Sequence, residues 1–174
     1  MESYDRSLLS RTLLPALLWL LAQLPAFAAA PDPAPIPRLE TGGHTAPIKR
    51  IAVDRAGRWL VTAADDKTAR VWDLQTGKLV QVLRPPIGGD ADEGKLYAVA
   101  ISPDGATVAV GGFTAAAGRP PSIYLFDRAT GALRRALGGL PNVVNHLAWS
   151  PDGQRLAATL YSGGLRVYDP AELR

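Results

Sequence analysis

The chain contains no cysteine among its 174 residues. This absence excludes disulfide bonds, thiolate metal sites and catalysis by a thiol nucleophile. It also excludes anchoring through the lipid-modified cysteine of a bacterial lipoprotein. Whatever stabilises this protein must therefore come from packing and hydrogen bonds alone.

The chain also lacks any run of like charges. Its formal net charge is +3, and acidic and basic residues are interspersed along the sequence. Nucleic-acid binding normally requires Lys and Arg clustered on one face or element, so we expect no nucleic-acid partner. The length favours a single domain, and 17 Gly and 15 Pro favour turns and short strands over long helices.

No apolar run reaches the roughly 20 residues that a membrane-spanning helix needs. Residues 1–28 instead have the features of an export signal, with two arginines before an apolar stretch at 13–22 and a small-residue cleavage site at Ala26-Phe27-Ala28. Cleavage would leave a Pro-rich linker at 29–38 and no membrane span. We therefore expect an exported protein, periplasmic or secreted. Two acidic residues weaken the positively charged region, so the alternative is an uncleaved segment that tethers the chain to the membrane.

Three segments align with one another without gaps over ten residues each, and they start 48 residues apart, at 48–57, 96–105 and 144–153. Each is followed by a short apolar run and then by an aromatic residue with aspartate, namely Trp72-Asp73, Phe126-Asp127 and Tyr168-Asp169. A period in the 40s indicates a repeat architecture in which each repeat is one supersecondary unit.

Within each repeat, short apolar runs bounded by Gly, Pro, Asp and Ser predict antiparallel strands joined by tight turns. The third repeat has room for three such strands rather than four. The expected strands are 48–53, 59–64, 69–74 and 78–83 in the first repeat, 96–101, 107–112, 122–127 and 133–137 in the second, and 144–149, 155–159 and 165–168 in the third.

These repeats resemble WD40 repeats, whose four-stranded sheets form the blades of a β-propeller. The likeness rests on Gly43-His44, on Trp72-Asp73 closing the third strand, and on three registered copies over residues 39–169. It implies an all-β fold, a partial β-propeller of about three four-stranded antiparallel blades in an incomplete ring after the N-terminal signal segment. The repeat domain would span 39–174, with blades at about 43–84, 94–138 and 142–174, the last incomplete.

The resemblance also implies a hydrogen-bond network inside the first blade. WD40 blades share a buried His, Ser or Thr, Asp and Trp, and His44, Thr62, Asp66 and Trp72 fill those four positions here. A buried indole N–H and a buried imidazole need partners. Counting back from Phe126 and Tyr168 finds no such set, so blades two and three are expected to rely on apolar packing.

The same residues permit a catalytic interpretation that the sequence does not favour. His44 and Asp66 could serve as a general base with an orienting acid, but no motif places a Ser or Cys nucleophile beside them. His146 falls in another repeat from His44, and two histidines on different blades make no metal site. We therefore expect no catalytic residue, no cofactor and no bound metal.

Two insertions of six residues break the spacing of the repeats. The turn glycine precedes the aromatic residue by 15 residues in repeats one and three but by 21 in repeat two, and the link between blades one and two is also six residues longer than the next. In an up-and-down sheet both insertions leave from the same edge, and scaffold-held loops often carry function. Tolerated variation in loop length explains the insertions equally well. The candidate partner-binding residues on them are Asp90, Asp92 and Glu93, with Phe113 and Arg119, whose opposite charges would face one partner.

Three blades are too few to close a ring, because propellers usually have four to eight. The end faces would be apolar and uncovered. Ile36 and Leu39 fit the outer strand that latches a WD40 ring, yet no last blade is present to receive it. We expect the chain to be a truncated product or the N-terminal piece of a longer exported protein; self-association of two chains into a six-bladed ring is the alternative.

The function expected from the sequence is a non-catalytic scaffold that binds a protein or peptide partner. Residues 139–153 and 165–169 also resemble repeats of bacterial WD40 proteins fused to a caspase-like peptidase. That resemblance gives the alternative function, a regulatory N-terminal region of a multidomain enzyme whose catalytic domain is not in this chain. A propeller hydrolase or lyase would need carboxylates or histidines repeated across blades, and the sequence contains no such repetition.

Overall fold

A computed structural model describes residues 42–87, 91–115 and 119–169 of the chain. The predicted signal segment, the linker and the Ile36–Leu39 latch lie outside these residues. The described residues form eleven strands and no helix, and therefore no helix that could span a membrane. The strands are β1 (Ile48–Val53), β2 (Trp59–Ala64), β3 (Ala69–Asp73), β4 (Leu79–Leu83), β5 (Leu96–Ile101), β6 (Thr107–Gly112), β7 (Ile123–Asp127), β8 (Leu133–Leu137), β9 (Val144–Trp149), β10 (Leu156–Leu160) and β11 (Leu165–Tyr168).

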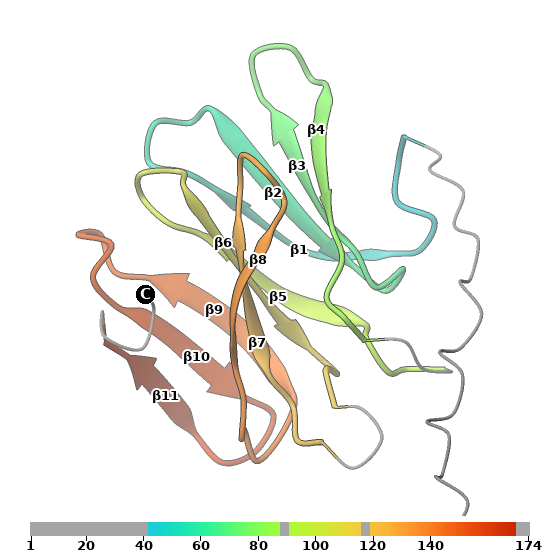
Figure 1. Cartoon of the computed structure of the whole chain (residues 1–174), viewed down its shortest axis with the longest axis vertical. Helices are drawn as coiled ribbons and strands as arrows, with labels where there is room; N and C mark the ends of the chain where they lie inside the picture. The colour runs from blue at the N-terminus through green and yellow to red at the C-terminus, as the bar shows by residue number, and fades with distance from the viewer. Residues whose placement is uncertain (1–41, 88–90, 116–118, 170–174) are drawn as a thin grey trace, which may run out of the picture. The chain divides into compact units, whose positions relative to one another are not determined.

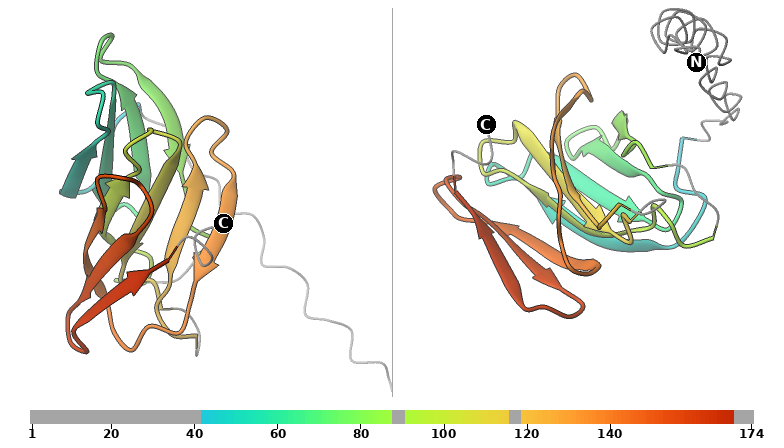
Figure 2. Two further views of the ribbon diagram at one scale, coloured as in Figure 1. Left: turned by 90° about the vertical axis from the view of Figure 1, so that its left-hand side faces the viewer. Right: turned by 60° about the horizontal axis from the view of Figure 1, so that its bottom comes forward.

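The strands form three antiparallel sheets, and in each sheet neighbouring strands follow one another along the chain. Sheet one contains β1 to β4, sheet two β5 to β8, and sheet three the three strands β9 to β11. Sheet two lies between the other two (Figures 1 and 2). None of the three sheets closes into a barrel, and each packs against the next one along the chain. This is the arrangement of blades in a partial propeller. The predicted fold class is confirmed, and the strands fall within one residue of their expected bounds.

Two apolar cores hold the three sheets together, because each strand buries alternate residues against a neighbouring sheet. The first core joins sheets one and two and contains Val61 and Val71 from sheet one with Val99, Val108 and Phe126 from sheet two. The second core joins sheets two and three through side chains that include Leu125, Ile123, Leu147 and Leu156. Each repeat therefore buries its apolar faces only against the repeats beside it.

The innermost strands of the three sheets lie next to one another, β1 beside β5 and β5 beside β9. On one edge of the molecule are the turns between the first and second and between the third and fourth strands of each sheet. We call this edge the turn edge. On the opposite edge are the turns between second and third strands and the links between sheets, and we call it the rim. Both insertions therefore belong to the rim.

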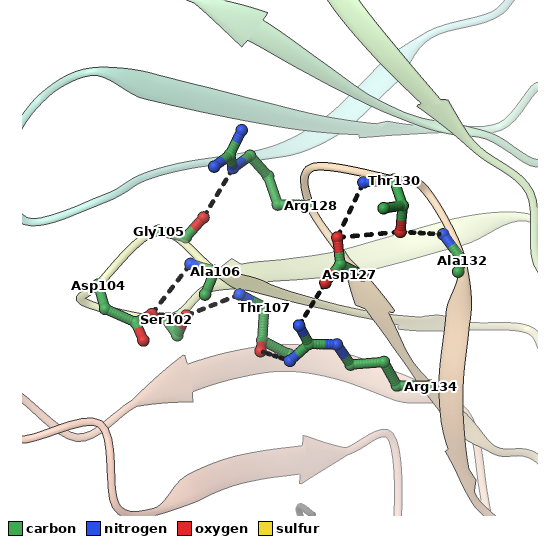
Figure 3. Close-up of polar contacts among 10 residues, drawn as sticks. All are labelled: Ser102, Asp104, Gly105, Ala106, Thr107, Asp127, Arg128, Thr130, Ala132 and Arg134. Carbon is green, nitrogen blue, oxygen red and sulfur yellow. Dashed lines mark hydrogen bonds and ion pairs between the residues drawn. The ribbon is translucent and has the colours of Figure 1, made fainter.

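The Ser-Pro-Asp-Gly turns of sheets two and three repeat one hydrogen-bond arrangement. Asp104 Oδ1 accepts hydrogen bonds from the Ser102 hydroxyl at 2.5 Å and the Ala106 amide at 2.9 Å (Figure 3). Asp152 accepts the same two bonds, from the Ser150 hydroxyl at 2.5 Å and the Gln154 amide at 2.9 Å. The serine hydroxyl comes first among the causes that hold the pKa of each aspartate below its ordinary value. A short local sequence thus supplies the same hydrogen bonds within both turns.

Trp59 joins sheet one to sheet two at the turn edge. Its indole ring lies between two guanidinium groups, with Arg58 Cζ 4.5 Å and Arg128 Cζ 4.2 Å from the ring centroid. Arg128 also donates from Nε to the carbonyl oxygen of Gly105 at 2.8 Å (Figure 3). A Cβ atom at Gly105 would lie 3.0 Å from the Trp59 ring, and the backbone there has a φ of 70°. Glycine is therefore the residue that both the turn and the indole accommodate.

Asp127, which ends β7, gives the turn edge an expected dependence on pH. Its carboxylate accepts hydrogen bonds from the Thr130 amide at 2.8 Å and the Thr130 hydroxyl at 3.0 Å, and it pairs with Arg134 (Figure 3). The Thr130 amide first, then Arg134, lower the pKa of Asp127 from 3.8 to about 2. Because the unfolded chain binds this proton more tightly, the stabilisation is complete above the unfolded pKa and is lost as the pH falls through about 2.

The expected result is that Asp127→Asn lowers the midpoint of thermal unfolding at pH 6, and that this difference from the parent chain disappears near pH 2. Circular dichroism melts of both chains at several pH values between these limits measure it. Arg134→Gln is the control, since it removes one of the two partners and should reduce the pH-dependent difference without abolishing it. A difference of the same size at both ends of the pH range would contradict the assignment.

Candidate functional site

Parts of the two insertions meet at the rim through backbone hydrogen bonds. The Gly94 amide donates to the Phe113 carbonyl oxygen at 2.7 Å, and the Phe113 amide donates to the Lys95 carbonyl oxygen at 2.9 Å. Gly112 permits this approach, because a Cβ atom there would lie 2.2 Å from the Lys95 carbonyl oxygen. The link between sheets one and two and the β6–β7 loop are therefore one connected surface.

A pocket of about 400 Å³ lies beside this contact, lined by the link between sheets one and two and by parts of sheet two. We call it the rim pocket. Its walls come from both insertions, with Ile87 on one side and Arg119 and Pro120 on the other, and Tyr124 belongs to β7 beneath them. The remaining lining residues are Pro86, Thr114, Ser122, Leu133 and Ala136. Apolar walls with an exposed guanidinium at one side suit a small apolar group that carries an adjacent negative charge.

The charged candidate residues are not arranged as the sequence analysis expected. Asp92 forms an ion pair with Lys95 at 2.5 Å, and the hydrogen bond from Lys95 comes first among the causes that lower the pKa of Asp92. Its charge is therefore neutralised locally, and Asp92 does not line the rim pocket. Glu93 is half-buried and does not line it either, whereas Arg119 does. Asp90 lies outside the described residues.

Phe113 contributes its backbone to the rim, and its side chain is half-buried beside the pocket-lining Thr114. Of the five candidate binding residues, Arg119 lines the pocket, Phe113 fixes the contact between the insertions, and Asp92 is occupied by Lys95. Tyr124 and Leu133 also line the pocket, and no sequence signal singled them out as binding residues. The pattern of apolar residues in β7 and β8 predicted only that these two residues belong to strands.

A second concave surface runs along the innermost strands. It is an open groove of about 490 Å³ formed by β1, β5 and β9 together with the turns that follow them. We call it the inner groove, and Arg55, His146 and Trp149 are among the residues that line it. Unlike the rim pocket, it has no contribution from either insertion.

The structure brings His44, Thr62, Asp66 and Trp72 together in one chain of hydrogen bonds. Trp72 Nε1 is 3.0 Å from Thr62 Oγ1, Thr62 Oγ1 is 2.6 Å from His44 Nε2, and His44 Nδ1 is 2.9 Å from Asp66 Oδ2. The contacts assign one direction, in which the indole donates to the threonine hydroxyl, the hydroxyl donates to the imidazole, and the imidazole donates to the carboxylate. Each donor then has one acceptor.

Asp66 is the end of this chain and the residue with the most partners. Its carboxylate also accepts hydrogen bonds from the Thr45 amide at 3.1 Å, the Thr68 amide at 3.0 Å and the Thr68 hydroxyl at 2.7 Å. Burial acts to raise the pKa of Asp66, but the hydrogen bonds from Thr68, His44 and Thr45 outweigh it and hold that pKa below its ordinary value. The carboxylate therefore ties the residues that precede β1 to the turn between β2 and β3.

A threonine, a histidine and an aspartate in line resemble a catalytic triad in their connectivity alone. The side chains of His44 and Asp66 are only 3% and 5% exposed, and Thr62 is 4% exposed. The Trp72 indole also donates to the threonine oxygen that would have to act as nucleophile. With its hydroxyl occupied and covered, the set has the features of a structural network.

Blades two and three contain smaller polar links where the sequence analysis expected only apolar packing. In blade two the Thr114 hydroxyl accepts from the Ser122 amide at 3.0 Å and donates to the Ser122 carbonyl oxygen at 2.6 Å. In blade three Asn142 Nδ2 donates to the Ser162 hydroxyl at 2.6 Å. Neither link joins the four residue types of the first-blade network, but counting back from Phe126 crosses the insertion and therefore passes over Thr114. Counting forward from the turn glycine places Thr114 at the position of Asp66.

No cluster of three or more His, Cys, Asp or Glu side chains with the arrangement of a metal site occurs in the part of the chain that the structure describes. His44 is committed to its network, and His146 is an exposed residue of β9 that lines the inner groove.

Comparison with known families agrees with this geometry. The family model described as "WD domain, G-beta repeat" matches residues 36–73 and 134–169. The chain contains WD40 repeats. The second match begins on β8 and ends after β11, so the sequence repeat straddles two sheets, with the outer strand of one followed by three strands of the next. Sheet two has the same strand order as sheet one, and one of the two insertions lies in its β6–β7 loop.

Relatives share part of this chain. It is 33% identical to Coronin-7 of Mus musculus over 114 residues, which are 64% of this chain and 12% of the mouse protein. It is 36% identical to the ribosome biogenesis protein BOP1 homolog of Oryza sativa over 61 residues, which are 33% of this chain and 9% of the rice protein. The chain thus matches only a small part of the length of each of these relatives.

Proposed function

We propose that this chain is a non-catalytic WD40 scaffold that binds a protein or peptide through its rim. The observation that carries the proposal is the rim pocket, to which both insertions contribute together with strands of sheet two. The WD40 repeats support a scaffold, and the burial of the His44 network argues against use of its Thr62 as a nucleophile. We expect the bound segment to place an apolar side chain against Tyr124 and a carboxylate near Arg119.

Panning a random heptapeptide display library on the immobilised full chain tests this proposal. The expected result is enrichment of peptides with Asp or Glu next to an aliphatic or aromatic residue. Arg119→Glu should weaken the binding of these peptides at least about tenfold, since it replaces attraction by repulsion. Arg55→Glu is the matched control, because Arg55 is an exposed arginine that lines the inner groove instead.

The two variants distinguish whether the chain binds peptides from which surface binds them. If Arg55→Glu abolishes binding and Arg119→Glu does not, the scaffold function stands and the inner groove is its surface. If no peptide is enriched above the level on an unrelated β protein, the peptide-binding function itself is contradicted.

We also propose that the scaffold is exported, on the N-terminal sequence alone. The intact mass of the native product from the periplasmic or secreted fraction is then expected to match a chain that begins at residue 29. A native product that retains residues 1–28 would contradict cleavage and favour a membrane-tethered scaffold.

A further inference from the structure

The wall of the rim pocket contains a buried polar side chain that the fold itself does not use. Tyr124 of β7 is 9% exposed, belongs to the core that joins sheets one and two, and lines the pocket. Its hydroxyl makes no hydrogen bond within the part of the chain that the structure describes. Because a buried tyrosine normally pairs its hydroxyl, an unpaired one beside a pocket points to a partner that comes from outside the chain.

Thr114, another lining residue, shows the contrast with Tyr124. It is 2% exposed, and its hydroxyl both accepts from the Ser122 amide and donates to the Ser122 carbonyl oxygen. Ser122 also lines the pocket but is half-buried, so its own hydroxyl has less need of a partner. Arg119 supplies an exposed guanidinium. The pocket therefore offers a ligand one exposed cation and one buried hydroxyl.

The buried hydroxyl restricts what can fill the pocket. Water satisfies a phenol that lines an open pocket, whereas a side chain that fills the pocket expels this water. A purely apolar side chain would then leave the Tyr124 hydroxyl buried without a partner, which weakens a complex by roughly five- to a hundredfold. A side chain that carries a polar atom to this hydroxyl avoids the loss.

The rest of the lining describes the body of that side chain. Pro86, Ile87, Pro120 and Leu133 present apolar surface. The volume of about 400 Å³ is near the lower end of the roughly 300–1,000 Å³ of ligand pockets, so it suits one large side chain. An apolar ring with a polar tip satisfies both conditions. Tyrosine has this combination, and its hydroxyl can both donate and accept.

We propose that the rim pocket selects a tyrosine of the bound peptide, whose hydroxyl pairs with that of Tyr124 while a neighbouring acidic residue lies near Arg119. The inference rests on the proposed peptide-binding function and makes Tyr124 a specificity-determining residue of that site. A site that hydrogen-bonds a hydroxyl rejects the analogue without it strongly, whereas apolar contact alone discriminates weakly. Phenylalanine differs from tyrosine by this hydroxyl alone and is therefore disfavoured.

Two peptides and two chains test this selection by fluorescence anisotropy. One labelled heptapeptide has Tyr-Glu at its centre and Gly and Ser elsewhere, and the other has Phe-Glu instead. The parent chain should bind the Tyr peptide at least about tenfold more tightly than the Phe peptide. Tyr124→Phe should remove or reverse this preference. It should leave the midpoint of urea unfolding unchanged, because the hydroxyl that it removes has no partner in the fold.

Tyr161→Phe is the matched control, since Tyr161 is 76% exposed after β10 and does not line the rim pocket. It should keep the parent's preference for the Tyr peptide. If Arg119→Glu weakens peptide binding but the parent chain does not prefer the Tyr peptide, or Tyr124→Phe keeps the preference, the role of Tyr124 is overturned and the scaffold function stands. If neither peptide binds while panning enriches others, the selection of tyrosine is overturned. If panning also enriches nothing, the peptide-binding function falls together with this inference.

Discussion

Phe126→Ala is expected to lower the free energy of unfolding by about 3–5 kcal/mol. Phe126 is 2% exposed and belongs to the core that contains Val61 and Val71 of sheet one and Val108 of sheet two. Its ring therefore holds two sheets together, and its removal leaves a cavity at their contact that neither sheet can fill without moving. Urea unfolding followed by circular dichroism and by tryptophan fluorescence measures the loss.

Two further variants make the Phe126 result specific. Phe126→Leu keeps most of the apolar volume and is expected to cost less than about 1.5 kcal/mol. Leu74→Ala removes a side chain that is 44% exposed and is expected to change stability by less than about 0.5 kcal/mol. A loss with Phe126→Ala no larger than that of Leu74→Ala would contradict a packed core between sheets one and two.

Asp66→Ala is expected to cost about 3 kcal/mol, because it removes the acceptor of four hydrogen bonds at once. The amides of Thr45 and Thr68, the Thr68 hydroxyl and the His44 imidazole all donate to this carboxylate. Water replaces the carboxylate only in part, since the side chains of His44 and Asp66 are almost fully buried. The loss should appear in urea unfolding as a lower midpoint with an unchanged slope.

The neighbouring carboxylate is the control for this prediction. Asp65 makes one ion pair, with the Nζ of the half-exposed Lys49 at 3.1 Å, and its removal is expected to cost less than about 1 kcal/mol. Asp66→Asn should have an intermediate effect, because an amide oxygen still accepts from Thr68 while the opposite end no longer accepts from His44. Equal losses with Asp65→Ala and Asp66→Ala would show that the network contributes nothing beyond a single ion pair.

The His44 network has the hydrogen bonds of a catalytic triad but lacks the access to substrate that catalysis requires. The distances from Thr62 to His44 and from His44 to Asp66, 2.6 Å and 2.9 Å, suit proton transfer. Catalysis also requires access to the nucleophile, and a 4% exposed threonine that already accepts from Trp72 offers none. A motif search that recorded only residue types and distances would assign a triad here.

The local sequence was sufficient for most of the fold. The strands followed from short apolar runs between Gly, Pro and Asp turns, and turns such as Ser102-Pro-Asp-Gly105 are held by hydrogen bonds within the turn itself. Equivalent positions in different blades were misassigned where they were found by counting residues along the chain instead of by their place in the sheet. Thr114 was missed because the six inserted residues separate it from Phe126 in sequence, although its place after β6 is the same as that of Asp66 after β2.

The candidate site was less predictable than the fold. Sequence spacing located the two insertions and topology placed them on one edge, but the rim pocket combines the link after β4 with residues of sheet two more than 25 positions further along the chain. Which charges remain available was also beyond the sequence. Asp92 turns to Lys95, three residues along, and only the folded loop decides that this pairing forms instead of one with Arg119.

The sequence by itself determined the repeat, the three sheets with their strand order, and the residue types that fill the blade network, because each of these depends on neighbours a few residues apart. The repeat count also predicted uncovered end faces, and only the tertiary structure showed how far each of their residues is exposed. Leu165 and Leu125 are strand residues with similar local surroundings, yet one is 56% exposed and the other 0% exposed. The physical reason is that burial depends on the presence of an adjacent sheet, and periodicity within a strand carries no information about that neighbour.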